Sequence, residues 1–278
     1  ETIATTNVGV DATLLGTKLD FSVDYFVKRN KNMLIPVTYP SMLGAIPPNT
    51  NAGELETKGF ETALTWQDKV GDFSYSARVM WSDAKNKIVD YGGRDTYDLG
   101  LNAIREGYPA NSYFAYEFDG LIRTQEELDA YKQLAGVPGD IGIGDAKFKD
   151  RNGDGRIDPY GTTPGDDGDV VFAGSTIPRH SYGLNLNVKW KNFDLGVFMQ
   201  GVGKRTLFRE GEYSIPWSDW WRQPPAFYYG NTWTEDRPDA EYPRLTHGNI
   251  RYWNYQPSTL QAINAAYLRL KNLQIGFS

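Results

Sequence analysis

The residues best suited to chemistry form one short acidic segment, Asp150 to Asp158. It reads D-x-N-x-D-G-x-I-D, so oxygen-bearing side chains recur at every second position. The front of an EF-hand-type calcium loop has this spacing, because a hard cation needs several oxygen ligands and a glycine permits the sharp turn between them. We therefore predict a structural Ca²⁺ site, with ligands from Asp150, Asn152, Asp154, the backbone of Arg156, and Asp158.

The segment departs from an EF-hand at its end, where Gly161 replaces the bidentate glutamate and the flanking residues are rich in turn formers. Asp166, Asp167 and Asp169 follow closely and are candidates to complete the ligand shell. A metal here would either hold a long loop closed, which offsets the entropy of loop closure, or bind cargo directly. The same sequence also fits a rigid Asp/Gly turn without an ion.

A second candidate site is an aromatic cluster between positions 217 and 255. Open aromatic faces suit the apolar C–H faces of sugars, and polar neighbours suit their hydroxyl groups. Two other interpretations carry equal weight: a loop core, or a contact surface for a lid protein, because exposed aromatic patches mark interfaces. The predicted substrate-binding residues are Trp217, Asp219, Trp220, Trp221, Arg222, Tyr228 and Tyr229.

The sequence argues against catalysis and against nucleic-acid binding. His180 and His247 are the only histidines, and neighbours on a strand such as His180 and Ser181 point to opposite faces. Nothing buries one carboxylate of the 166–169 cluster to raise its pKa, as a glycosidase acid requires. The chain has no cysteine, which excludes thiol nucleophiles, and its net charge of −6 is unlike the basic surface of a nucleic-acid binder.

The elements that must position these residues are amphipathic strands. Apolar and polar residues alternate with a period of two, which places the apolar residues on one face. The seventh run slips in phase near Asn272. The predicted strands cover 8–14, 19–27, 60–66, 73–81, 182–190, 193–199 and 267–277.

A membrane barrel explains these strands better than a soluble all-β protein, the remaining alternative. Globular strands average about five or six residues, and these are longer. Tight connections near 15–17, 67–71 and 190–192 alternate with long ones at 30–56, 87–178 and 203–264, as in outer-membrane barrels. Aromatic residues at strand ends suit the membrane interfaces: Tyr25, Trp66, Trp81, Tyr182 and Trp190.

No apolar run approaches the length of a transmembrane helix, about 18 residues. The second long connection contains one predicted short helix. Thr124 is its N-cap, Glu127 completes a capping box, and Leu128, Tyr131 and Leu134 form its apolar stripe.

Several sequence blocks resemble the C-terminal half of the barrel of SusC-like TonB-dependent outer-membrane transporters of Bacteroidetes. No single block identifies the family. Together the blocks follow the order of the family's motifs along almost the whole chain. The blocks are Lys58-Gly59-Phe60-Glu61, Glu106-Gly107-Tyr108-Pro109, Asp119-Gly120-Leu121-Ile122, Asp150 to Gly155, Gly174 to Gly183, Asn192-Phe193-Asp194-Leu195, Trp233-Thr234-Glu235-Asp236, Tyr242-Pro243-Arg244-Leu245 and Ala266 to Leu273.

The resemblance implies an all-β fold in which residues 1–278 form the C-terminal portion of a 22-stranded antiparallel barrel. Seven strands cannot close such a barrel, and open edges in lipid would leave backbone groups unsatisfied, so we expect a plug and further strands elsewhere in a longer chain. The family works in the outer membrane, in contact with lipid and lipopolysaccharide. Its energy comes from TonB–ExbB–ExbD through the plug.

The resemblance further implies a SusD-like surface lipoprotein as a lid, a dimer of transporter–lid pairs, and import of oligosaccharides. Import of peptides is the first alternative, and a non-transporting surface glycan-binding protein is the second. A calcium-dependent glycoside hydrolase is the least favoured.

Overall fold

We analysed a computed structural model of the chain. It describes all residues except 37–48, 93–98, 101–102, 161–165, 167 and 217–222. Among the described residues, no helix is both long and apolar enough to span a membrane.

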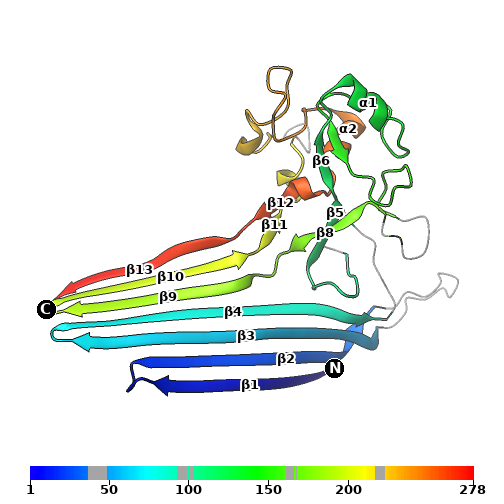
Figure 1. Ribbon diagram of the computed structural model, residues 1–278. Helices are drawn as coiled ribbons and strands as arrows, with labels where there is room; N and C mark the ends of the chain where they lie inside the picture. Colours follow the sequence, from blue (N-terminus) through cyan, green and yellow to red (C-terminus); the bar gives the residue numbers. More distant parts are fainter. Residues whose placement is uncertain (37–48, 93–98, 101–102, 161–165, 167, 217–222) are drawn as a thin grey trace.

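A seven-stranded antiparallel sheet is the frame of the molecule, with strand order β1-β2-β3-β4-β9-β10-β13 (Figure 1). The seven predicted strands are all present, and neighbours along the sheet pair antiparallel. Their bounds are β1 Thr2–Leu14, β2 Leu19–Ile35, β3 Thr50–Val70, β4 Phe73–Tyr91, β9 Arg179–Trp190, β10 Phe193–Lys204 and β13 Tyr267–Phe277.

Several strands are longer than the alternation predicts, and β3 begins at Thr50 instead of position 60. The added segments are polar, so apolar and polar residues no longer alternate there, although the backbone pairing continues. Cross-strand ion pairs occupy this part of the sheet: Glu56 lies 2.8 Å from Arg29 on β2. The pattern therefore located the apolar band of each strand and missed its polar extension.

The strand register joins the apolar residues into one continuous face. One row across the sheet reads Phe21, Leu64, Val79, Leu184 and Met199, each directly opposite the next. Directly opposed residues share a face. Among the described residues no second sheet covers this face, and Ile275 on β13 remains 74% exposed.

The opposite face is mainly polar. One of its rows reads Asp24, Glu61, Ser82 and Ser181. A sheet that is apolar on one side and polar on the other along strands this long matches the wall of a water-filled barrel in lipid.

The predicted phase slip in the last strand is a β-bulge. Phe198 pairs with Asn272, the next pair is Met199 with Leu270, and Lys271 is skipped. The extra residue restores the alternation, so Leu270 and Leu273 both lie on the apolar face.

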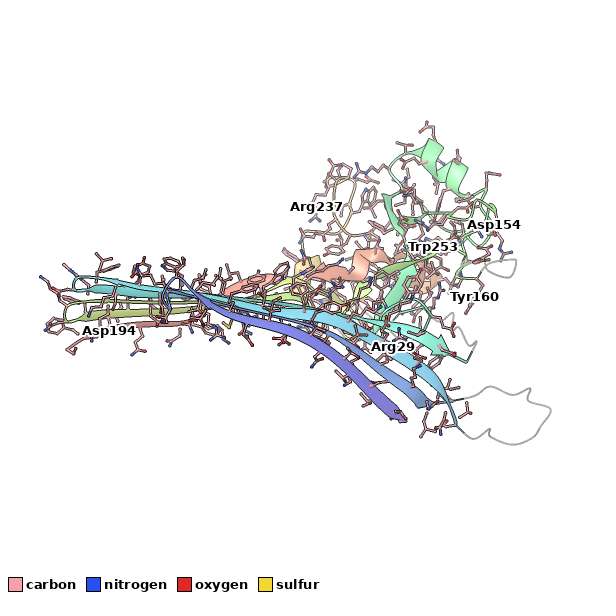
Figure 2. The ribbon with its side chains drawn as sticks, turned by 60° about the horizontal axis from the view of Figure 1, so that its bottom comes forward. Arg29, Asp154, Tyr160, Asp194, Arg237 and Trp253 are labelled. Atoms are coloured by element: carbon pink, nitrogen blue, oxygen red, sulfur yellow. The ribbon has the colours of Figure 1, made fainter. Side chains whose placement is uncertain are left out.

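The tight turns lie at one end of the sheet, and the two longest connections form a cap at the other end (Figures 1 and 2). We use "cap" for the described residues of 99–178 and 205–266. Its strands are β5 Ser112–Tyr116, β6 Phe118–Leu121, β7 Ala146–Phe148, β8 Val170–Ser175, β11 Thr206–Phe208 and β12 Ala262–Asn264. Its helices are α1 Gln125–Tyr131, α2 Gly248–Asn254, η2 Gly211–Tyr213, η3 Ala226–Tyr228 and η4 Thr259–Gln261.

Helix α1 confirms the predicted capping box. The Thr124 hydroxyl accepts a hydrogen bond from the Glu127 amide at 3.2 Å, and the Glu127 carboxylate accepts one from the Arg123 amide at 2.7 Å. These bonds satisfy amides that a helix start leaves unpaired. Leu128 and Tyr131 point into the cap.

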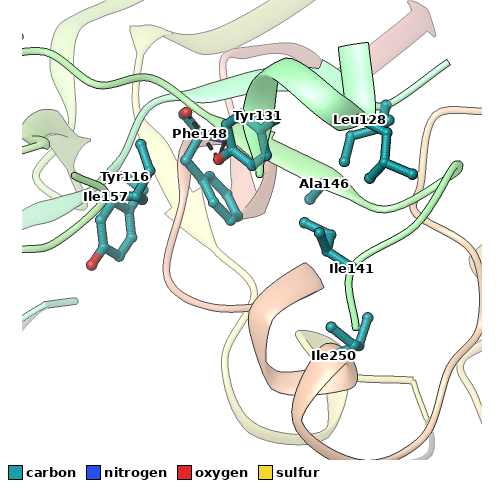
Figure 3. Packing of buried hydrophobic residues seen from close by; sticks show 9 residues of the cluster. Tyr116, Leu128, Tyr131, Ile141, Ala146, Phe148, Ile157 and Ile250 are labelled. Atoms are coloured by element: carbon teal, nitrogen blue, oxygen red, sulfur yellow. Dashed lines mark hydrogen bonds between the residues drawn. The ribbon is translucent and has the colours of Figure 1, made fainter. Parts of the chain in front are cut away.

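The main hydrophobic core lies in the cap (Figure 3). Tyr131 anchors it, because its hydroxyl donates to the Phe148 carbonyl at 3.1 Å and accepts from the Phe148 amide at 2.7 Å. The cap is therefore a folded unit and not a set of independent loops. The buried core residues are Tyr116, Ile122, Leu128, Tyr131, Ile141, Ala146, Phe148, Ile157 and Ile250.

Candidate functional site

A buried ion pair joins the two long connections of the cap. Asp145 is fully buried, and its two carboxylate oxygens accept hydrogen bonds from Arg244 Nε and Nη2, each at 2.7 Å. Asn254 Nδ2 donates to the same carboxylate at 2.8 Å. Bidentate arginine–carboxylate pairs are strong and directional. The hydrogen bonds that Arg244 donates to the Asp145 carboxylate raise the pKa of Arg244 above its ordinary value.

Backbone contacts extend this junction. Asn254 Oδ1 accepts from the Ala146 amide at 2.9 Å, and the Arg244 amide donates to the Gly144 carbonyl at 2.9 Å. Gly144 has φ +87°, and a Cβ there would overlap the ring of Trp233. The segment around Asp145 is distant in sequence from the segment that holds Trp233 and Arg244, and the structure brings the two together.

The acidic segment forms a tight turn held by its own carboxylates. Asp150 accepts hydrogen bonds from the Gly153 and Gly155 amides at 2.7 and 2.9 Å, and Asp154 accepts one from the Arg156 amide at 2.9 Å. Gly155 has φ +79°, as the turn prediction requires.

Asp169 is the buried centre of this turn. Its carboxylate accepts from the Arg151 amide at 2.6 Å and the Asp158 amide at 3.0 Å. Burial raises the pKa of Asp169, and the negative charges of Asp150 and Asp154 raise it further. The expectation that nothing buries a carboxylate of the 166–169 cluster is therefore wrong at Asp169, which is 1% exposed. The structure thus gathers the predicted residues around Asp169.

The remaining acidic residues are also accounted for. Asp166 accepts a hydrogen bond from Asn152 Nδ2 at 3.0 Å, and Asp158 pairs with the Arg156 side chain at 2.8 Å. Within the described part of the chain, no three His, Asp or Glu side chains are arranged as ligands of one ion. Asp167 lies outside the described residues. These hydrogen bonds fit both alternatives, the Asp/Gly turn and the Ca²⁺ site, and Ca²⁺ stays a prediction.

Removing the turn's carboxylates and removing calcium should have different effects. The double substitution Asp150→Ala with Asp154→Ala should increase protease cleavage within 149–169 whether or not Ca²⁺ is bound, because the backbone amides of the turn lose their hydrogen-bond acceptors. If Ca²⁺ holds the loop, a chelator should produce the same cleavage in the unsubstituted protein, and added Ca²⁺ should reverse it. Asp129→Ala, at an exposed position on α1, is the matched control. Cleavage unchanged by chelator would contradict the metal site.

Most of the predicted aromatic site lies outside the described residues: Trp217, Asp219, Trp220, Trp221 and Arg222. The two described members differ from each other. Tyr228 is 2% exposed, and its hydroxyl donates to the Ser214 carbonyl at 3.0 Å, whereas Tyr229 is 92% exposed. Burial raises the pKa of Tyr228. Tyr228 therefore fits the loop-core alternative, and Tyr229 is available to a cargo or partner.

Sequence reasoning missed a cavity of about 740 Å³ between the two long connections. Its polar lining includes Arg209, Gln256 and Gln261. No motif connects these residues, so only their proximity in the folded cap could reveal the site.

Three relatives from Formosa agariphila align with the whole chain. They are TonB-dependent receptors P26, P3 and P39, at 25%, 26% and 23% identity. The chain is a homologue of TonB-dependent receptors. It spans 28%, 27% and 29% of the length of these relatives, and no family model matches it.

Solved structures of the RagAB peptide transporter share this fold. One superposes with a TM-score of 0.70 at 21% identity, covering 98% of this chain and 28% of that chain. The open-open state of the RagAB peptide importer gives 0.68 at 21% identity, covering the same 98% and 28%.

These comparisons confirm that the sheet of this TonB-dependent receptor homologue is part of an antiparallel outer-membrane barrel. Barrel closure and the total of 22 strands stay predictions. The relatives are receptors and transporters, which is consistent with the prediction of no enzyme activity.

Proposed function

We propose that the complete protein imports an oligomeric nutrient across the outer membrane with energy from TonB. One observation carries the proposal: a sheet with one apolar and one polar face aligns over its whole length with TonB-dependent receptors. The apolar face contacts lipid and lipopolysaccharide, and the polar face lines the interior of the barrel. TonB–ExbB–ExbD acts through a plug supplied by the rest of the chain.

The cap is the part of this chain that meets cargo and partner. It lies at the end opposite the tight turns, where outer-membrane barrels carry their extracellular loops (Figure 1). Its ion-paired junction keeps two long connections in a fixed arrangement. Tyr229 and Tyr252, which is 54% exposed, give it aromatic surface suited to a SusD-like lipoprotein lid. A dimer of transporter–lid pairs is part of the same proposal.

Oligosaccharides and peptides are the two cargo classes. The resemblance of the sequence blocks favours oligosaccharides. The similarity to structures named as a peptide transporter supports peptides.

Uptake by whole cells tests this function. Deleting the complete gene should abolish growth on the cargo oligomer, and the intact gene should restore growth only in cells with functional TonB. Pulldown of the complete protein should recover a surface lipoprotein. Binding without uptake would support a surface glycan-binding protein instead, and release of free sugar from polysaccharide would support a hydrolase.

A further inference from the structure

A group of exposed cationic side chains continues the apolar face of the sheet toward the cap. From the apolar row Phe21, Leu64 and Val79, positions two apart along β2, β3 and β4 stay directly opposed, without a register shift, for the next four rows. Residues two apart on a strand share a face, so these rows point to the same side as the apolar residues. The cations of the last two rows and the next such residue of β2, together called the basic patch, are Arg29, Lys31, Lys58, Lys85 and Lys87.

The basic patch lies just beyond the aromatic end of the apolar band. Tyr25 and Phe60 are directly opposed in the row before it, and Phe60 packs edge-on against Trp81 with ring centroids 4.7 Å apart. Figure 2 shows Arg29 at the cap end of the sheet. Aromatic residues of a membrane barrel lie at the level of the lipid headgroups, so cations one step further along the same face are placed among those headgroups.

The cations are confined to one end and one face of these three strands. From the tight turns to the aromatic residues, the apolar-face positions of β2, β3 and β4, all of them described, hold no lysine or arginine. At the height of the basic patch, the described residues on the polar face of the same strands include one cation, Lys28. The chain as a whole has a net charge of −6, so the basic patch opposes the overall charge. This distribution is complementary to an anionic layer at the cap end.

Two carboxylates neutralise part of the basic patch. Glu56 lies 2.8 Å from Arg29 and 2.7 Å from Lys58. Glu54 lies 3.9 Å from Lys31. Five cations against two carboxylates leave an excess of positive charge on this surface.

That excess is concentrated at Lys85 and Lys87. Both are exposed, and neither forms an ion pair with a described residue. Lys85 also lines a cavity of about 340 Å³ at the cap end of β4, and Asp83, two positions before it, is already paired with Arg179. No carboxylate lines this cavity, and its charged lining residues are Lys85, Arg179, Lys204 and Arg205. The surface therefore suits an anion with several oxygen atoms.

We propose that the basic patch binds the phosphate groups of lipopolysaccharide in the outer leaflet. Phosphate groups attract lysine and arginine side chains at a membrane surface, and their oxygens accept charge-assisted hydrogen bonds. Lys85 and Lys87 would donate to these oxygens, while the acyl chains lie along apolar residues such as Phe21 and Val79. The inference rests on the proposed function, which places this face in lipid and the cap outside the cell, and it names the headgroup that the face recognises.

Binding of lipid A, the phosphorylated anchor of lipopolysaccharide, tests the site. The complete protein, with any lipoprotein that accompanies it, is purified in non-ionic detergent and titrated with bisphosphorylated lipid A, and native mass spectrometry measures the bound lipid. Lys85→Gln with Lys87→Gln removes the two unpaired charges from exposed positions. Lys28→Gln with Lys69→Gln is the matched control, because both lysines are exposed and lie on the polar face.

The unsubstituted protein and the control should bind lipid A equally. Loss of Lys85 and Lys87 should weaken binding about thirtyfold, the equivalent of about 1 kcal/mol for each lysine near an anionic lipid surface. Lipid A without its phosphates should bind the unsubstituted protein no better than bisphosphorylated lipid A binds the Lys85/Lys87 variant. Equal binding of bisphosphorylated lipid A by all three proteins, or equal binding of both lipids by the unsubstituted protein, would overturn the site.

Inorganic phosphate distinguishes the lipid headgroup from free phosphate. In millimolar excess it should leave lipid A bound, and complete displacement would identify a site for free phosphate and overturn the lipid assignment. TonB-dependent growth with a protein that shows no selectivity for phosphorylated lipid A would overturn the site and leave the import function standing. Selective binding by a protein that supports no uptake would keep the site and overturn the import function.

Discussion

Lysine in place of Leu186 should prevent normal assembly of the complete protein in the outer membrane. Leu186 lies in the middle of β9, directly opposite Ala77 on β4 and Val197 on β10, and Val197 in turn lies opposite Leu273. A charge on this face would enter hydrocarbon. For lysine near the bilayer midplane the cost is about 2–4 kcal/mol.

The neighbouring position provides the control. Asn187 points to the opposite face, where it lies between Ser76 and Gly196. Asn187→Lys should cost under about 1 kcal/mol, because lysine there stays in a polar environment. Folding of the complete protein into lipid vesicles, followed by gel mobility and urea titration, measures both variants. Equal folding of Leu186→Lys and Asn187→Lys would contradict the assignment of faces.

The second large effect is expected at the junction of the cap. Asp145→Ala leaves the Arg244 guanidinium and the Asn254 amide without their shared acceptor. The buried Asn254 amide loses its acceptor, which costs about 1–3 kcal/mol, whereas the Arg244 side chain is 34% exposed and can be partly hydrated. We expect the cap to become sensitive to protease at lower temperature while the sheet remains folded.

Two comparisons make this experiment specific. Asp239→Asn removes an exposed pairing with Arg123, at 3.1 Å, and should cost under about 1 kcal/mol. The double variant Asp145→Leu with Arg244→Met replaces both charges by apolar groups and should recover part of the stability. Limited proteolysis with mapped cleavage sites measures each variant. If Asp145→Ala matches Asp239→Asn, the ion pair does not hold the connections together.

The sequence by itself determined the strands, their apolar face and the capped helix α1. These features are local: alternation fixes which side each residue faces, and Thr124 and Glu127 are three residues apart. The same locality explains why the loss of alternation near Asn272 indicates the bulge in β13.

Only the tertiary structure decided how the cap is built. Asp145 and Arg244 are 99 positions apart, and no periodicity relates them. Tyr228 and Tyr229 are adjacent and of one residue type, yet one is buried and the other exposed. The carboxylates of the acidic segment match a calcium loop in spacing, and in the folded chain they also accept hydrogen bonds from nearby amides. Only the fold decided that Asp169 joins this turn, because its partners, the Arg151 and Asp158 amides, lie 18 and 11 positions away.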